Sequence, residues 1–193
     1  MKVQVLGLGN PLLADDAAGI RVAQALERRA LNEGFEVDWT EAGGMDLVDA
    51  LIGYDAVLLV DAMLSDQSAG TLCVLEAGDI PAGQRPSGAH EADLGRAMSV
   101  ARRLGLKTPL IRILAIAAEN LSDFGTPLTP AVEAAIGPAA QMALELARDL
   151  RERVLNAGEG HGEQAVGLQR LTLPPAGFEN VCGGPGNERR GHA

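Results

Sequence analysis

Residues 3–29 read VQVLGLGNPLLADDAAGIRVAQALERR, and this stretch decides the fold. Val3 to Leu8 is a short run rich in leucine and β-branched residues, which predicts a buried strand running into a tight turn at Gly7 to Pro11. From Asp15 onward the apolar residues recur at helical spacing. They are Ala18, Val22, Ala25 and Leu26. Acids at the beginning of this segment and arginines at its end suit the helix dipole, so the stretch predicts strand, loop and helix.

The same alternation continues along the chain. Further strands are expected at residues 35–40, 56–60, 71–75 and 110–117, and further helices at 46–52, 91–104 and 130–154. Pro138 is expected to bend or interrupt the last helix. The pattern predicts an α/β three-layer sandwich, in which helices cover both faces of a twisted, mostly parallel sheet with 71–75 as an antiparallel edge strand.

Composition limits the domain organisation and the partners. The chain of 193 residues suits one α/β domain at 1–155, followed by a Gly/Pro-rich tail at 156–193 that we expect to be poorly ordered. A net charge of −10 disfavours nucleic acid and anionic membranes as partners. Cys73 and Cys182 are far apart, which fits a reducing cytosol, and no signal peptide or membrane span is evident. We therefore expect a cytoplasmic protein, and a monomer.

Two aspartates are the first candidates for chemistry. Ligands of open parallel sheets bind in the crevice at the carboxyl ends of the strands. Asp16 follows the first strand and its turn, and Asp61 ends the most apolar strand of the sequence, where a carboxylate needs a compensating partner. Asp16 could instead be a helix N-terminal acid, and Asp61 could cap a loop.

His90 is the third candidate, because it is the only histidine outside the tail. A lone histidine is usually a surface or helix-terminal residue. Two carboxylates and one imidazole together, however, suit a borderline divalent metal such as nickel or zinc. The sequence does not determine whether Asp16, Asp61 and His90 converge.

Other chemistries lack the residues that they need. Gly7-Leu-Gly9 is not followed by the third glycine of a dinucleotide-binding turn, and Asp15 and Asp16 would repel a pyrophosphate. The sequence has no Gly-x-Ser-x-Gly motif, and neither cysteine sits with a histidine in a strand-end motif. Nucleotide binding and acyl-enzyme chemistry are therefore disfavoured.

From about residue 3 to 153 the sequence resembles the hydrogenase maturation endopeptidases. The residues that carry the resemblance are Val5 to Asn10, Asp15 and Asp16, Gly19 to Val22, Leu59 to Ala62, Ser87 to His90, Leu128 to Pro130 and Val132. The resemblance implies a twisted sheet between helix layers. It also implies an enzyme that removes a C-terminal extension from the large-subunit precursor of a [NiFe] hydrogenase after nickel has been inserted.

In the resemblance, Asp16 matches the family's metal-contacting acid, Asp61 its strand-end aspartate and His90 its loop histidine. The resemblance thus implies that these three residues are catalytic and bind metal. The resemblance implies that the nickel belongs to the substrate, so no permanent cofactor is expected, although other divalent metals can occupy such a site. An incomplete set of ligands leaves room for the partner's ligands, and a metal-bound carbonyl or water is polarised for hydrolysis. That one aspartate acts as general base on water is our hypothesis.

The sequence departs from the family at three places. Glu41-Ala-Gly-Gly-Met45 stands where the family has Asp-Gly-Gly-Thr, so Glu41, Gly43 and Gly44 are the expected substrate-recognition residues. Ala115 to Glu119 replaces a Gly-Ile-x-Pro turn, and the tail has no counterpart. These departures concern substrate selection more than chemistry.

Two alternatives come from other functional classes. Peptidyl-tRNA hydrolases share Gly-Leu-Gly-Asn-Pro, but they need a histidine soon after it and a basic surface for tRNA phosphates, whereas this chain has Asp15-Asp16 and a charge of −10. A chaperone or docking protein could use the same three ligands to bind a nickel-loaded large subunit without cutting it. The sequence leaves this second alternative open.

Overall fold

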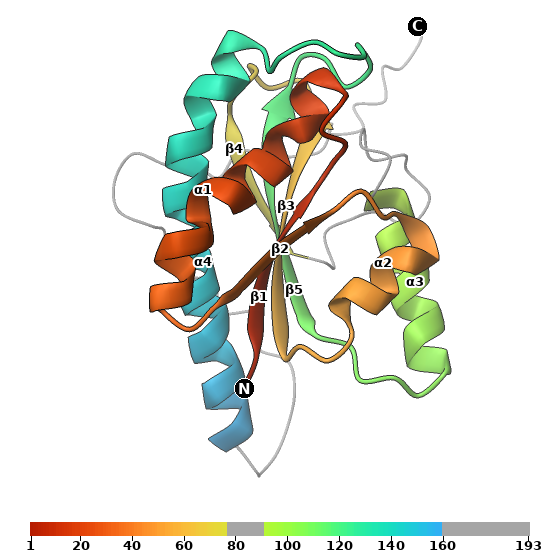
Figure 1. Ribbon diagram of the computed structural model, residues 1–193. Helices are drawn as coiled ribbons and strands as arrows, with labels where there is room; N and C mark the ends of the chain where they lie inside the picture. The colour runs from red at the N-terminus through yellow and green to blue at the C-terminus, as the bar shows by residue number, and fades with distance from the viewer. Residues whose placement is uncertain (77–90, 160–193) are drawn as a thin grey trace, which may run out of the picture. The chain divides into compact units, whose positions relative to one another are not determined.

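The computed structural model describes residues 1–76 and 91–159, within a compact unit, Met1–Glu163 (Figure 1). Its strands are β1 (Val3–Leu8), β2 (Glu36–Thr40), β3 (Ala56–Leu64), β4 (Leu72–Glu76) and β5 (Leu110–Ala118). Its helices are the 3-10 helix η1 (Ala14–Ala17) and the α-helices α1 (Ala18–Asn32), α2 (Gly44–Leu51), α3 (Glu91–Arg103) and α4 (Pro130–Glu159). Each predicted element is present, with ends shifted by a few residues.

The strands form one sheet in the order β2-β1-β3-β5-β4. The pairs β1–β2, β1–β3 and β3–β5 are parallel, whereas β4 runs antiparallel to β5. The prediction of a mostly parallel sheet with an antiparallel edge strand is therefore confirmed. Because β1, β3 and β5 are parallel, their carboxyl ends meet at one edge of the sheet, which lies at the top of Figure 1.

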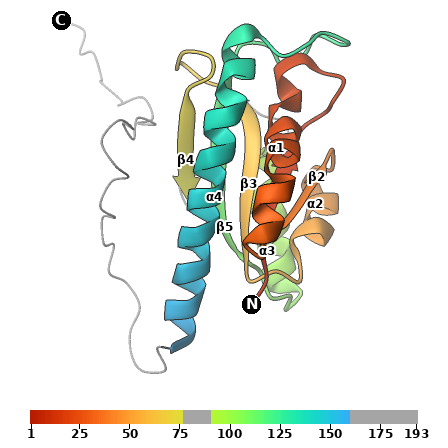
Figure 2. The same ribbon diagram turned by 60° about the vertical axis from the view of Figure 1, so that its left-hand side comes forward.

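Helices cover both faces of the sheet. Helices α1 and α4 lie on one face, and α2 and α3 on the other, as Figures 1 and 2 show. Each pair encloses its own buried apolar cluster against the sheet. Both clusters are mainly aliphatic, and Phe35 is the one aromatic side chain among the largest fully buried ones described. The three-layer sandwich predicted from the alternation of strands and helices is confirmed.

The structure differs from the sequence predictions at several points. Asp15 and Asp16 lie in η1, not in the first turn of an α-helix, and Ala25 is exposed. Strand β3 continues to Leu64, because its pairing with β5 extends through Leu64 and Ala118, so Asp61 lies inside a strand and not at its end. In the described part of the chain no helix is both long and apolar enough to cross a membrane.

Helix α4 runs through Pro138 to Glu159, so the proline does not interrupt it. Pro138 lacks the N–H that would bind the carbonyl of Ala134, and both residues are exposed, where water can replace the missing donor. The helix also passes residue 155, where we expected the tail to begin. Residues 160–193 of that predicted tail lie outside the described residues.

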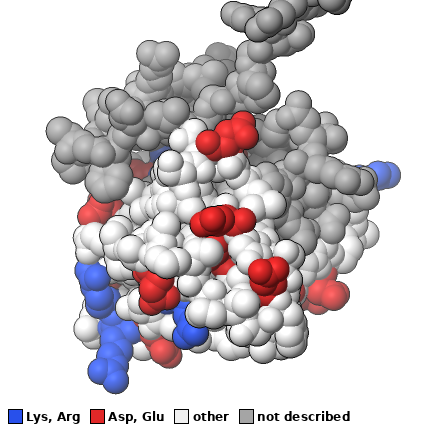
Figure 3. All heavy atoms as spheres, turned by 90° about the horizontal axis from the view of Figure 1, so that it is seen from above, with Lys and Arg blue, Asp and Glu red and all other residues white. Residues whose placement is uncertain are grey.

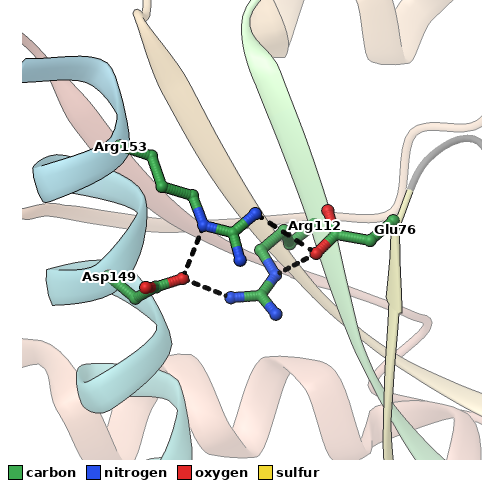
Figure 4. A network of polar contacts seen from close by, with 4 residues as sticks. All are labelled: Glu76, Arg112, Asp149 and Arg153. Carbon is green, nitrogen blue, oxygen red and sulfur yellow. Dashed lines mark hydrogen bonds and ion pairs between the residues drawn. The ribbon is translucent and has the colours of Figure 1, made fainter. Parts of the chain in front are cut away.

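Ion pairs hold α4 to its neighbours on either side. Arg148 binds Glu33, just after α1, through two hydrogen bonds of 2.6 and 2.7 Å, and this contact lowers the pKa of Glu33. Figure 4 shows a second group, in which Arg112 of β5 and Arg153 of α4 alternate with Glu76 of β4 and Asp149 of α4. Its four contacts range from 2.7 to 3.4 Å. These contacts fix α4 against the edge strand as well as against α1.

Two glycines allow α1 to approach the sheet closely. A Cβ atom on Gly19 would lie 2.3 Å from the carbonyl oxygens of Leu8 and Val60, and one on Gly7 would lie 2.3 Å from the Gly19 oxygen. No side chain fits into such a gap. The start of α1 therefore rests directly on the end of β1 and on the middle of β3, which brings the η1 segment to the carboxyl edge of β1.

We expect Gly19→Ala to lower the free energy of unfolding by about 1–3 kcal/mol, because its methyl group would force α1 away from two strands. Gly95→Ala is the matched control, since Gly95 lies in α3 and a Cβ atom there would meet nothing within 4 Å. Alanine there should be neutral or stabilise by roughly 0.5–1 kcal/mol. Urea unfolding followed by circular dichroism measures both, and equal stabilities of Gly19→Ala and the parent would contradict the close-contact argument.

Candidate active site

Asp16 is held at the carboxyl edge by a loop that closes on itself. Its Oδ2 accepts a hydrogen bond of 2.7 Å from the N–H of Asn10, and its own N–H donates to the carbonyl of Leu13 at 2.8 Å. Gly9 has a φ of +141°, and a Cβ there would lie 1.8 Å from the Asp16 carbonyl oxygen. The Gly-x-Gly-Asn turn therefore positions a carboxylate and not a phosphate, in agreement with the sequence argument against nucleotide binding.

Asp61 is buried inside the apolar strand β3, with 1% of its surface exposed. It pairs with Ala115 of β5, one residue beyond the pairing of Val60 with Gly7 of β1, so it lies where β1 ends. Its Oδ1 accepts a hydrogen bond of 2.8 Å from the N–H of Ala62. Because η1 packs against β3, the structure places the two predicted aspartates on adjacent elements at the same edge.

The third predicted ligand, His90, lies outside the described residues. Within 1–76 and 91–159, no group of three or more histidine, cysteine, aspartate or glutamate side chains is arranged to hold a metal ion. The described part of the site therefore consists of Asp16 and Asp61.

The predicted substrate-recognition residues lie in the connection from β2 to α2, at the same edge. Glu41 is exposed, and Gly43 and Gly44 form the beginning of α2, where Gly44 has a φ of +59° that favours glycine. The N–H of Gly9 donates to the carbonyl of Thr40 at 3.3 Å, which joins the end of β2, where this connection begins, to the turn before Asp16. The three residues therefore follow closely on the end of β2, beside the Gly9 turn.

Asp15 is a residue whose role the sequence did not reveal. Its carboxylate is fully buried and accepts four hydrogen bonds of 2.7 to 3.1 Å. The donors are the backbone N–H groups of Glu119, Asn120 and Thr129 and the hydroxyl of Thr129. Asp15 therefore fastens η1 to both ends of the connection from β5 to α4. The adjacent Asp15-Asp16 pair was the only sequence signal, and it does not say which acid points inward.

The described loops around this edge contain acidic residues and no basic ones. The described connections at 9–17, 41–43, 65–71 and 119–129 contain no Lys or Arg, and they contain Asp15, Asp16, Glu41, Asp66, Glu119 and Asp123. Figure 3 looks down on this edge, where acidic groups lie among uncharged ones and the visible basic groups lie toward the periphery. The face is suited to an apolar or positively charged partner.

Comparison with known proteins shows the family of the chain. A family model described as hydrogenase maturation protease matches residues 20–146. The chain belongs to the hydrogenase maturation protease family. The hydrogenase 2 maturation protease of Escherichia coli K12 is 32% identical over 153 residues, which cover 77% of this chain and 92% of that protein.

Solved structures of maturation proteases have the same fold. The hydrogenase maturating endopeptidase HybD from Escherichia coli is 29% identical, with a TM-score of 0.64 over 77% of this chain and 93% of that one. The [NiFe] hydrogenase maturation protease HybD from Thermococcus kodakarensis is 26% identical, with a TM-score of 0.58 over 76% and 99%. The chain is therefore a hydrolase of the endopeptidase type, which confirms the predicted family and disfavours both a peptidyl-tRNA hydrolase and a non-catalytic docking protein.

In this maturation protease, we expect Asp15→Asn to lower the free energy of unfolding by about 1.5–3 kcal/mol, because the amide NH₂ would face donors that now bind a carboxylate. Thr129→Val should cost roughly 0.5–1.5 kcal/mol through loss of one hydroxyl donor. Thr129→Ser keeps that hydroxyl and is the matched control. Denaturant unfolding measures all three variants, and parental stability of Asp15→Asn would show that these contacts do not hold the loop.

Proposed function

We propose that this protease removes a C-terminal extension from the large-subunit precursor of a [NiFe] hydrogenase after nickel has been inserted. The observation that carries the proposal is the placement of Asp16 and Asp61 on adjacent elements at the carboxyl edge of the sheet, in a chain of the hydrogenase maturation protease family. This edge is where open parallel sheets bind their ligands.

In this proposal, Asp16, Asp61 and His90 contact the nickel that the precursor carries. Carboxylate and imidazole groups suit a borderline divalent ion, and three donors leave coordination positions for ligands of the substrate. One oxygen of each aspartate is fixed by a backbone N–H, from Asn10 for Asp16 and from Ala62 for Asp61. Such second contacts orient a metal-binding carboxylate before the metal arrives. The protease has no permanent metal of its own in this scheme, although other divalent ions can occupy the site.

The chemical step is the addition of water to the carbonyl of the bond to be cut. One aspartate acts as general base, as in aspartyl proteases: it accepts a proton from water as the water oxygen bonds to the carbonyl carbon. The carboxylic acid so formed returns this proton to the leaving amine when the C–N bond breaks, which regenerates the carboxylate. Contact with the substrate's nickel polarises the reacting group. Glu41, Gly43 and Gly44 would contact the substrate segment from the neighbouring connection. From the sequence we further expect a cytoplasmic monomer.

The direct test mixes the purified protein with nickel-loaded and nickel-free precursors of a cognate hydrogenase large subunit and follows truncation by mass spectrometry. We expect truncation at the C-terminus of the loaded precursor alone. Absence of truncation in both precursors would refute the proposed function, and equal truncation of both would refute recognition of nickel.

Asp16→Asn and Asp61→Asn should each slow processing by about 100-fold or more, because one of them removes the proton acceptor and each removes a charged contact to the substrate's nickel. Asp38→Asn is a matched control: Asp38 also accepts a hydrogen bond from the next residue's N–H, but it lies exposed on β2. Processing rates and thermal unfolding are compared for the three variants. If either active-site variant processes the precursor at the parental rate, that aspartate has no catalytic role.

A further inference from the structure

We propose that the connection from β5 to α4, residues 119–129, is the element on which the substrate protein docks, with Phe124 as its principal contact. The inference rests on the proposed function, because it assigns the binding surface of the same site. The docking lip, as we call it, comprises residues 119–129 together with Leu12 and Leu13.

The docking lip presents two apolar side chains to solvent. Phe124 is 73% exposed, the highest value among the large hydrophobic side chains of the described residues, and Leu12 is 52% exposed. The two segments are joined, since Leu13 and Phe124 form an antiparallel bridge and the N–H of Gly125 donates to the carbonyl of Leu12 at 2.8 Å. Exposed aromatic side chains of this kind are the typical anchors of protein interfaces.

Hydrogen bonds hold the docking lip in one conformation before any partner binds. Asn120 Oδ1 accepts from the N–H groups of Ser122 and Asp123, and the Thr126 hydroxyl donates to the carbonyl of Asp123. Asp15 fixes both ends of the loop. A loop that is already ordered loses little conformational entropy on binding, so an exposed aromatic ring on it can contribute most of its contact energy to affinity.

The docking lip is continuous with the active site. Leu13 accepts a hydrogen bond of 2.8 Å from the N–H of Asp16, and Asp15, which holds the loop, is the residue next to Asp16. The surface formed by Phe124 and Leu12 is thus joined through Leu13 to the segment that carries the proposed catalytic Asp16. This continuity with the proposed active site is the reason for assigning the substrate as the occupant.

Charge defines the chemistry of the segment that fits here. Glu119 and Asp123 are exposed on the lip, and no described connection at this edge contains Lys or Arg (Figure 3). A complementary segment combines an apolar side chain, which packs on Phe124, with Lys or Arg, which approaches the two acids. We therefore expect the precursor to present such residues close to the bond that is cut.

The test compares processing kinetics of the full chain acting on nickel-loaded precursor. Phe124→Ala should raise KM about tenfold or more and leave kcat within about twofold, as for loss of an interface anchor that does not take part in the reaction. Phe124→Leu should restore most of the affinity. Leu104→Ala is the control, because Leu104 is 69% exposed but follows α3, before β5 begins. Asp123→Lys should also raise KM, by an amount that shrinks as salt is added.

The outcomes distinguish failure of the docking proposal from failure of the proposed function. If the parent chain cleaves the precursor and Phe124→Ala has an unchanged KM, docking on the lip is refuted while the protease function stands. A change in oligomeric state of Phe124→Ala without a change in KM would mean that a second copy of the chain occupies the lip, which also refutes it. Failure of the parent chain to cleave would refute the proposed function itself.

Discussion

The buried carboxylate of Asp15 is the contact on which the arrangement of the site depends. A charged group can remain in a protein interior only if its lost hydration is replaced, and Asp15 obtains this from three backbone N–H groups and one hydroxyl. Those donors belong to the connection between β5 and α4. The hydrogen bonds that stabilise this one carboxylate therefore hold three parts of the chain together: η1, the loop at 119–129 and the beginning of α4.

Close packing of backbone supplies the second constraint. Gly7, Gly9 and Gly19 bring the η1 segment so near to β1 and β3 that side chains are excluded at each contact. The glycines of the Gly-x-Gly-Asn turn thus serve the placement of Asp16, whereas the same spacing in nucleotide-binding folds makes room for a phosphate. Whether such a turn positions a carboxylate or binds a phosphate therefore depends on the residues that follow it.

Ion pairs hold the β4 edge of the sheet to α4. A group of four charged side chains joins the antiparallel edge strand to α4, and each acid lies between two arginines (Figure 4). Its members are Glu76, Arg112, Asp149 and Arg153. Alternation of sign around the group lets every charge face its opposite, which offsets the cost of partly burying Arg112. Helix α4 is consequently anchored at its beginning by the Asp15 loop and further along by ion pairs, so the site is built on a rigid layer.

The sequence by itself determined the order and type of the elements, because periodicity is a local property, and it predicted the antiparallel edge strand and the candidates Asp16 and Asp61. It did not determine that β3 extends beyond Asp61, since strand length depends on pairing with β5, or that α4 passes through Pro138, since that depends on which side of the helix faces water. Above all, the sequence did not reveal the structural role of Asp15. Only the tertiary structure decided that Asp15 is the acid that binds the connection from β5 to α4, because the donors that satisfy it lie more than 100 residues away.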